Sequence, residues 1–215
     1  TIHDYTPRES SVLAEGIVCN TPNITRDELW NDAEEAEKRK NSTVARELTM
    51  SLPSNASEHQ MNDACLQMAT FLVEKYEVAV DYAIHKPSWK GDQRNYHCHM
   101  MFTTRVVGYF GDFHEKTRIL DDRKTGKEQT VLIRQKWSEI TQAIAENPEA
   151  WDHRSYKQRG IDKIPQKHVG VKARNCERNA DDGWLSDKTK HNIEVTADNN
   201  KTLELTMRAD ELDAQ

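Results

Sequence analysis

The sequence is poor in cysteine, and its thiols are not spaced as in metal-binding or disulfide-rich domains. It has four, Cys19, Cys65, Cys98 and Cys176, and no two form a CxxC pair. This excludes a cysteine-based zinc knuckle and a disulfide framework, because both need close and regular spacing. We expect reduced thiols, as in a cytoplasmic protein.

Long apolar runs and an excess of positive charge are also missing. No stretch approaches the roughly 18 apolar residues of a membrane span, and the chain begins at Thr1 without a charged-then-apolar signal segment. The 30 Lys and Arg stand against 36 Asp and Glu, a formal net charge of -6. This excludes a protein that coats nucleic acid by bulk electrostatics. We predict a cytoplasmic protein with no membrane segment, in which any nucleic-acid contact uses a local basic surface.

Two β-type runs joined by a polar loop lie between residues 78 and 104, and we predict that they pair antiparallel. Because side chains alternate across a strand, His85 falls opposite the apolar residues of the first run, and His97 and His99 share one face of the second. If the apolar faces join one core, the three imidazoles converge on the other face, as one divalent metal requires. A lone strand histidine is more often structural or solvated, and the residues alone leave both interpretations open.

Capping residues and periodicity predict the other elements. Thr25 and Glu28 form a capping box that begins a helix, and Ser54 or Ser57 begins a longer one. The strand between them carries Glu47 on its second face, which is the histidine side if this strand joins the same sheet. We predict helices at 25–40, 54–76 and 127–143, a strand at 41–53, an irregular segment at 1–24 and a mobile loop or weak hairpin at 105–126.

Residues 151–174, here called the basic arm, are rich in His, Arg and Lys, and the turn-forming residues Gly160, Pro165 and Gly170 interrupt them. Such an arm can follow a line of phosphates. It can equally be a solvated loop that packs Tyr156 on the sheet edge, and both interpretations stay open at this point. The chain after it is polar, and its last residues have few large apolar side chains, so we expect the beginning of a helix or a linker toward a further domain.

Several short motifs together resemble the MobA/MobL family of plasmid relaxases, which belong to the HUH endonucleases. The matches span most of residues 28–173. They are Ala45-Arg46-Glu47-Leu48 leading to Leu52-Pro53, Ile84-His85-Lys86, Asn95-Tyr96-His97-Cys98-His99-Met100-Met101, Thr104-Arg105, Asp152-His153-Arg154-Ser155-Tyr156, Gly160-Ile161-Asp162, Pro165 and His168-Val169-Gly170.

The resemblance implies an α+β fold, with a central antiparallel β-sheet, helices packed on one face and a three-histidine metal site on the other. It implies a relaxase domain over residues 1–193 that lacks its extreme N-terminus, and a polar tail or linker toward a further domain over residues 194–215. In the family, a tyrosine near the N-terminus attacks the scissile phosphate and forms a 5′-phosphotyrosine link. We expect that tyrosine upstream of Thr1, and we do not expect Tyr5 to be the nucleophile.

The resemblance assigns the metal ligands to His85, His97 and His99. Glu47 matches an acidic residue near the site, which either orients an imidazole or handles the tyrosine's proton. The expected working ion is Mg²⁺ or Mn²⁺, although imidazoles alone favour Zn²⁺ or Ni²⁺. The implied activity is metal-dependent nicking and rejoining of one DNA strand in plasmid mobilisation or conjugation.

The implied partner is single-stranded or hairpin DNA of a plasmid transfer origin (oriT), with accessory relaxosome proteins and a type IV coupling protein as further partners. Tyr156 is available to stack on a base. The candidate DNA contacts are Lys86, Arg105, Arg154, Tyr156, Lys157, Lys167, His168 and Lys172.

Three alternatives compete with this interpretation. A rolling-circle replication initiator or a transposase uses the same HUH chemistry at a different origin. A non-catalytic DNA-binding module would keep the metal site and lack the nucleophile. A zinc hydrolase would use the three histidines to activate a water molecule.

Overall fold

The structure is a computed structural model that describes residues 12–89 and 92–213. It divides into two compact units, Thr1–His153 and Arg154–Gln215. The predicted boundary between residues 193 and 194 therefore falls inside the second unit. Tyr5 lies outside the described residues. All four cysteines are free thiols, and no helix in the described ranges is both long and apolar enough to cross a membrane.

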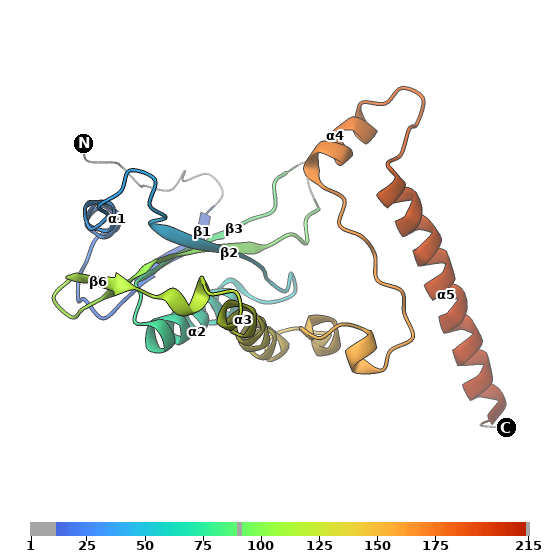
Figure 1. Ribbon diagram of the computed structural model, residues 1–215. Coiled ribbons are helices and arrows are strands. Elements are labelled where there is room, and N and C mark those ends of the chain that lie inside the picture. The colour runs from blue at the N-terminus through green and yellow to red at the C-terminus, as the bar shows by residue number, and fades with distance from the viewer. Residues whose placement is uncertain (1–11, 90–91, 214–215) are drawn as a thin grey trace. The chain divides into compact units, whose positions relative to one another are not determined.

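The first unit is built on a four-stranded antiparallel sheet (Figure 1). Its strands are β1 (Val12–Val18), β2 (Ala45–Ser51), β3 (Val80–His85) and β4 (His97–Thr103), in the spatial order β1-β3-β4-β2. The predicted antiparallel pairing of the two histidine strands is confirmed, with His85 opposite His97 and Ala83 opposite His99.

Strand β1 corrects the prediction of an irregular segment at 1–24. Its residues do not alternate apolar with polar, so its sequence carries no strand signal, yet its backbone pairs with β3. Gly16 is required where it crosses Tyr82, because a Cβ there would lie 2.9 Å from the ring. A close tertiary contact thus accounts for this residue, and local sequence does not.

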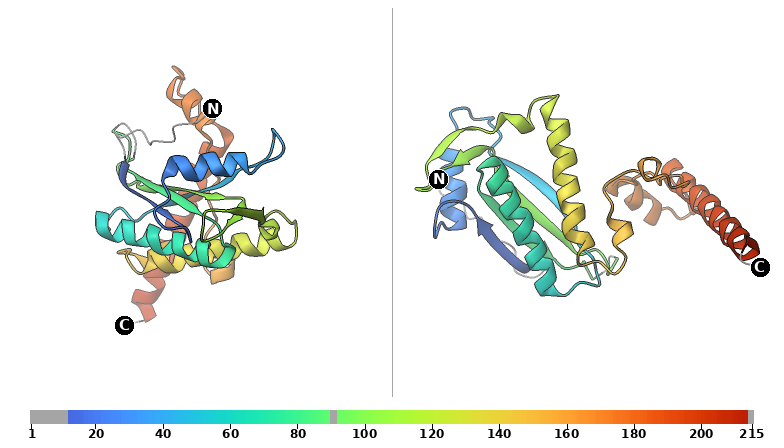
Figure 2. Two further views of the ribbon diagram at one scale, coloured as in Figure 1. Left: turned by 90° about the vertical axis from the view of Figure 1, so that its left-hand side faces the viewer. Right: turned by 90° about the horizontal axis from the view of Figure 1, so that it is seen from below.

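Two helices cover one face of the sheet, α2 (Glu58–Tyr76) and α3 (Thr125–Gln142), which lie side by side in Figure 2. The capping box at Ser57 begins α2, as one of the two predicted starts. The main core lies between these helices and the sheet, and its fully buried members include Met68, Leu72, Ile84 and Met100. Ile84 in β3 and Met100 in β4 each stand next to a histidine along their strand, so the core side of the sheet is opposite the histidine side.

The helix α1 (Arg26–Glu35) lies on the other face of the sheet, which corrects the prediction that all helices share one face (Figure 1). Its narrow stripe, Leu29, Trp30 and Ala33, is buried against Ala79 and Val107 in a second core cluster. A stripe of three apolar residues gives no information on which face a helix will cover, so the sequence could not place α1.

Asp81 ties α1 to the sheet. The Arg26 guanidinium donates two hydrogen bonds of 2.8 Å to the two carboxylate oxygens of Asp81, and Trp30 Nε1 donates a third of 2.9 Å. Asp81 shares its face of β3 with His85, four residues further along the strand. The helix therefore covers the part of this face that is distant from the histidines.

A short hairpin follows β4, formed by β5 (Arg105–Val107) and β6 (Phe113–Lys116), as one of the two predicted forms of this segment. Glu37, just beyond the end of α1, joins this segment to the hairpin through ion pairs of 2.9 Å with both Arg105 and Lys116. Its side chain is only 6% exposed. The predicted extension of this helix to Lys40 is replaced by an irregular turn that delivers Glu37 to the two cations.

The second unit contains α4 (Val171–Arg178) and the long α5 (Asp187–Asp213). Residues 194–213 are helical, so of the two forms expected for this polar segment, the beginning of a helix or a linker, the helix is observed. Polar composition alone does not exclude a helix when its side chains bind another segment of the chain, as Asn192 and Asn199 do here.

Glu37 and its partners Arg105, Lys116 and Ser42, here called the Glu37 cluster, predict a loss of stability in acid. Burial of the Glu37 carboxyl raises its pKa, but hydrogen bonds from Arg105, Lys116 and Ser42 lower it more, and the resulting pKa is about 2, below the usual 4.5. Because the folded pKa is depressed, the stabilising contribution is complete above about pH 4.5 and is lost as pH falls toward 2. Glu37→Gln should cost about 2 kcal/mol in the free energy of unfolding at pH 7, as for a charged pair with one partner removed.

Urea unfolding at a series of pH values measures this effect. The difference between wild type and Glu37→Gln should shrink steadily below pH 4.5. Glu35→Gln, at an exposed position at the end of α1, serves as the control, and its free energy of unfolding should stay within about 0.5 kcal/mol of wild type. A difference at pH 7 that persists unchanged at pH 2.5 would contradict the assignment.

Candidate metal centre and nucleic-acid interface

The three predicted histidines lie together at one end of the sheet. His85 is the last residue of β3, and His97 and His99 open β4, so strand pairing brings them into register. Their ring centroids are 5.6 Å apart for His85 and His97, and 5.2 Å apart for each pair that includes His99. Their strand neighbours Ile84 and Cys98 are fully buried on the opposite face.

This spacing suits a shared metal ion. Three imidazole nitrogens at about 2.1 Å from one ion, in near-tetrahedral positions, place their ring centres about 5 Å apart. In residues 12–89 and 92–213, however, no group of three or more His, Cys, Asp or Glu side chains forms a finished ligand set. The spacing of the rings and the chemistry of the donors fit an ion, whereas the side chains as they stand do not form a complete ligand set.

Two of the imidazoles are oriented by hydrogen bonds at their Nδ1 atoms. His97 Nδ1 lies 2.9 Å from the Asn95 carbonyl oxygen, and His99 Nδ1 lies 2.5 Å from Glu47 Oε1. Both partners are acceptors, which assigns the proton to Nδ1 and leaves the Nε2 lone pair for a ligand. Such outer contacts fix the tautomer and ring direction of metal-binding histidines.

Glu47 reaches His99 from β2, where Thr49 is the direct partner of His99 and Glu47 the next residue on the same face. The Glu47 side chain is 52% exposed and that of His99 is 40% exposed, so the pair is open to a ligand from solvent. The sequence predicted this proximity, but it could not identify the Asn95 carbonyl, because every residue carries one.

The third imidazole, His85, is partly buried beside the other two rings. Burial lowers the pKa of His85, and the neighbouring His99 and His97 lower it further. A lowered pKa favours the neutral imidazole, which is the form that binds metal.

The loop between β3 and β4 adds a residue that the sequence reasoning missed. Trp89 is 84% exposed, in the same hairpin that carries the histidines. A large aromatic residue in a polar loop was the available signal. Lys86 is also in this hairpin, 4.0 Å from Glu58 with its side chain 55% exposed. Arg105, another predicted DNA contact, is instead held by Glu37 and the His114 carbonyl at the other end of the sheet.

The basic arm of the second unit is held by side-chain amides of α5. Asn192 accepts from the Lys167 backbone N–H at 2.7 Å and donates to its carbonyl at 2.8 Å. Asn199 makes the same pair of bonds, each 3.0 Å, with Ile164. Their seven-residue separation puts them on one face of the helix. These four bonds use the backbone groups of Ile164 and Lys167 and do not involve the Lys167 ammonium.

The arm's candidate contacts are all at the surface of this unit. Tyr156 is 38% exposed and precedes a short 3₁₀ turn at Lys157–Arg159. Lys172 lies in the first turn of α4. The exposed candidates are Arg154, Tyr156, Lys157, Lys167, His168 and Lys172.

A family model described as the MobA/MobL family matches residues 1–179. The chain belongs to the MobA/MobL family. The resemblance inferred from the histidine motifs is thus confirmed, and the match extends through the basic arm. The three histidines all lie within the residues that the MobA/MobL family model matches.

Two curated relatives extend the comparison. The mobilization protein MobL of Acidithiobacillus ferridurans is 27% identical over 205 residues, which cover 82% of this MobA/MobL chain and 54% of the relative. The conjugal transfer protein TraA of Agrobacterium fabrum is 26% identical over 180 residues, covering 71% of the chain and 15% of the relative. The chain thus spans about half the length of the first relative and a small part of the second.

One solved structure also aligns with the chain. It comes from work on the molecular basis of vancomycin resistance transfer in Staphylococcus aureus. The TM-score is 0.47 with 22% identity, over 69% of this chain and 72% of that one.

The amide clamps on the arm predict a change in protease sensitivity. In Asn192→Ala/Asn199→Ala, the arm loses four hydrogen bonds to α5, so trypsin should cleave after Lys163 and Lys167 several-fold faster than in wild type. Because Ala favours helix over Asn, faster cleavage would not come from melting of α5. Asn200→Ala, at an exposed position of the same helix, is the control. Equal cleavage rates in all three proteins would show that the clamps do not hold the arm.

Proposed function

We propose that this chain is the DNA-processing domain of a mobilisation relaxase, which nicks and rejoins one strand at a plasmid transfer origin. The observation that carries the proposal is the His85, His97 and His99 group, with two rings oriented through Nδ1, in a chain of the MobA/MobL family. The names of the relatives, a mobilization protein and a conjugal transfer protein, support the same process.

In this proposal the three imidazoles hold a divalent cation over the open end of the sheet. When bound, the cation would polarise a non-bridging oxygen of the scissile phosphate and offset the charge of the transition state. The Asn95 carbonyl and Glu47 accept the Nδ1 protons, so Nε2 of His97 and of His99 would be the nitrogens that bind the cation. The expected working ion is Mg²⁺ or Mn²⁺, while Zn²⁺ or Ni²⁺ would bind such a nitrogen set more tightly.

The strand is broken by transesterification. A tyrosine hydroxyl, which we assign to residues upstream of Thr1, loses its proton and forms a bond to phosphorus. The bond from phosphorus to the 3′ oxygen breaks, and this oxygen takes up a proton as the free 3′-hydroxyl. The covalent 5′-phosphotyrosine conserves the phosphodiester energy, so the reverse reaction rejoins the strand. As an alternative to orienting His99, Glu47, which is half exposed, would accept the tyrosine's proton.

Single-stranded or hairpin DNA is the proposed substrate. Lys86 lies in the histidine hairpin, where it is suited to a phosphate next to the cleaved one, and Trp89 is suited to stacking on an unpaired base. The exposed cations of the arm would bind further phosphates. Accessory relaxosome proteins and a type IV coupling protein are the proposed protein partners.

The decisive experiment uses the full-length protein with a supercoiled plasmid that carries its transfer origin. With Mg²⁺ or Mn²⁺ we expect a nick at one position of one strand and a covalent protein–DNA adduct. His97→Ala should reduce nicking by at least about a hundredfold, because a metal ligand is lost. Its stability should change little, because the ring lies off the core. His59→Ala is the matched control, since His59 is 84% exposed on α2.

The other outcomes would either contradict the histidine assignment or favour a different function. Normal nicking by His97→Ala would contradict the histidine assignment. Tight DNA binding without a nick or adduct would favour a binding module, and Zn²⁺-dependent cleavage without an adduct would favour a hydrolase. Cleavage at a replication origin in place of a transfer origin would favour an initiator or transposase.

Glu47 gives a separate prediction. Glu47→Gln keeps the shape of the side chain and removes the charge that accepts the His99 proton, so metal affinity should fall about tenfold or more. Calorimetric titration with Mn²⁺ measures this directly, without DNA. Glu74→Gln, at an exposed position of α2, is the control. Unchanged Mn²⁺ affinity and unchanged nicking would show that Glu47 is an ordinary surface carboxylate with no role at the site.

A further inference from the structure

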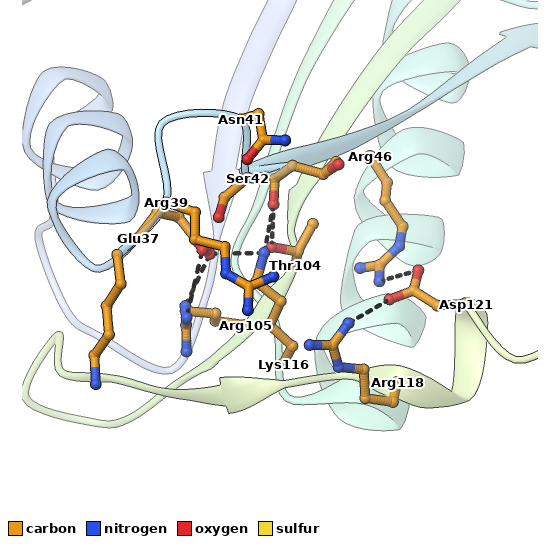
Figure 3. Close-up of a pocket in the computed structure, with 12 residues that line it drawn as sticks. Glu37, Arg39, Asn41, Ser42, Arg46, Thr104, Arg105, Lys116, Arg118 and Asp121 are labelled. Carbon is orange, nitrogen blue, oxygen red and sulfur yellow. Dashed lines mark hydrogen bonds and ion pairs between the residues drawn. The ribbon is translucent and has the colours of Figure 1, made fainter.

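A cavity of about 630 Å³ lies at the other end of β4 from the histidines (Figure 3). Its walls are the turn after α1, the start of β2, the end of β4, the β5–β6 hairpin and the turn that follows it. Thr104, on its wall, is five residues beyond His99, which is about 17 Å along a strand. The cavity is therefore separate from the histidine centre.

Two carboxylates fix three of the cations in the cavity wall. Glu37 pairs with Arg105 and Lys116, and Asp121 pairs with Arg46 at 2.8 Å. These side chains are mostly enclosed: Lys116 is 14% exposed, Arg46 is 18% exposed and Arg105 is 21% exposed. The lining is thus a rigid arrangement of paired charges, which is what a preorganised binding site requires.

Positive charge remains in excess after this pairing. Six Lys and Arg line the cavity against two carboxylates, in a chain whose net charge is -6. Arg118 contacts Asp121 only at 3.7 Å and its side chain is 75% exposed. Figure 3 shows the guanidinium groups of Arg39, Arg46 and Arg118 turned toward the same space. Such a concentration of cations in an acidic chain favours an anionic ligand.

The chemistry of the cavity points to phosphate. Guanidinium groups bind phosphate oxygens through paired, charge-assisted hydrogen bonds. The hairpin that forms one wall also carries an exposed aromatic pair, Tyr109 and Phe110, with ring centroids 5.3 Å apart and exposures of 64% and 90%. Cations combined with exposed aromatic rings are the usual surface for unpaired nucleotides.

We propose that this cavity binds a backbone phosphate of the same DNA strand that the histidine centre processes, some distance from the cleaved bond. The proposal rests on the proposed function for its choice of DNA as the ligand. Arg39 and Arg118 supply the direct contacts, and the Glu37 and Asp121 pairs hold the surrounding cations in place.

The test compares DNA affinity as a function of salt in the full-length protein. The probe is a DNA hairpin with a single-stranded tail. Arg39→Gln/Arg118→Gln should lower affinity about tenfold at low salt and reduce the slope of log K against log salt by roughly 1.5, as expected for two lost phosphate contacts. Lys75→Gln/Lys127→Gln removes the same charge at exposed positions that do not line the cavity, and should change the slope by much less.

Two further measurements separate this inference from the proposed function. If wild type fails to nick its origin but the cavity variant still loses affinity and slope, the relaxase assignment fails and the phosphate site stands. If wild type nicks normally and the cavity variant binds like wild type, the phosphate site is wrong and the relaxase assignment stands. Displacement of the hairpin by polyglutamate at equal charge concentration would also overturn the proposal, because it would show an acidic protein surface to be as good a ligand.

Discussion

The antiparallel register of β3 and β4 is the constraint on which the candidate centre depends. Pairing of His85 with His97 and of Ala83 with His99 brings three rings from two strands to one corner of the sheet. The same alternation buries Ile84 and Cys98 beneath them. A slip of one residue would turn the imidazoles into the core and the apolar side chains into solvent, so the free energy of core formation also fixes the positions of the three histidines.

The position of α1 limits how much of the histidine face is open. Arg26 and Trp30 both donate to Asp81, and Leu29 is fully buried beneath the helix. One half of this face is therefore a second small core, and only the half with the histidines meets solvent. A ligand that approaches the face is directed to the imidazoles because the remainder of the surface is occupied by the protein itself.

The sequence predicted the parts of the fold whose signals are local. Capping boxes at Thr25 and Ser57 begin the helices observed, and alternation placed all three histidines and Glu47 on one side. It failed where tertiary contacts decide. Strand β1 is stabilised by pairing with β3, and α5 holds the arm through side-chain amides, which polar composition does not indicate. The family was recognisable from motifs, but the Asn95 carbonyl and the Glu37 cluster required coordinates.

Charge is organised differently at the two ends of β4. At the histidine end, three imidazoles lie together and the nearby carboxylate of Glu47 bonds to a ring nitrogen of His99. At the other end, carboxylates are enclosed by Arg and Lys, so the net field there attracts anions. Under the proposed function, a DNA strand with phosphates at regular intervals would place one phosphate at the histidines and another at the guanidinium groups of the cavity. The net charge of -6 therefore does not exclude DNA as the ligand in the proposed function, because six Lys and Arg are concentrated around one cavity.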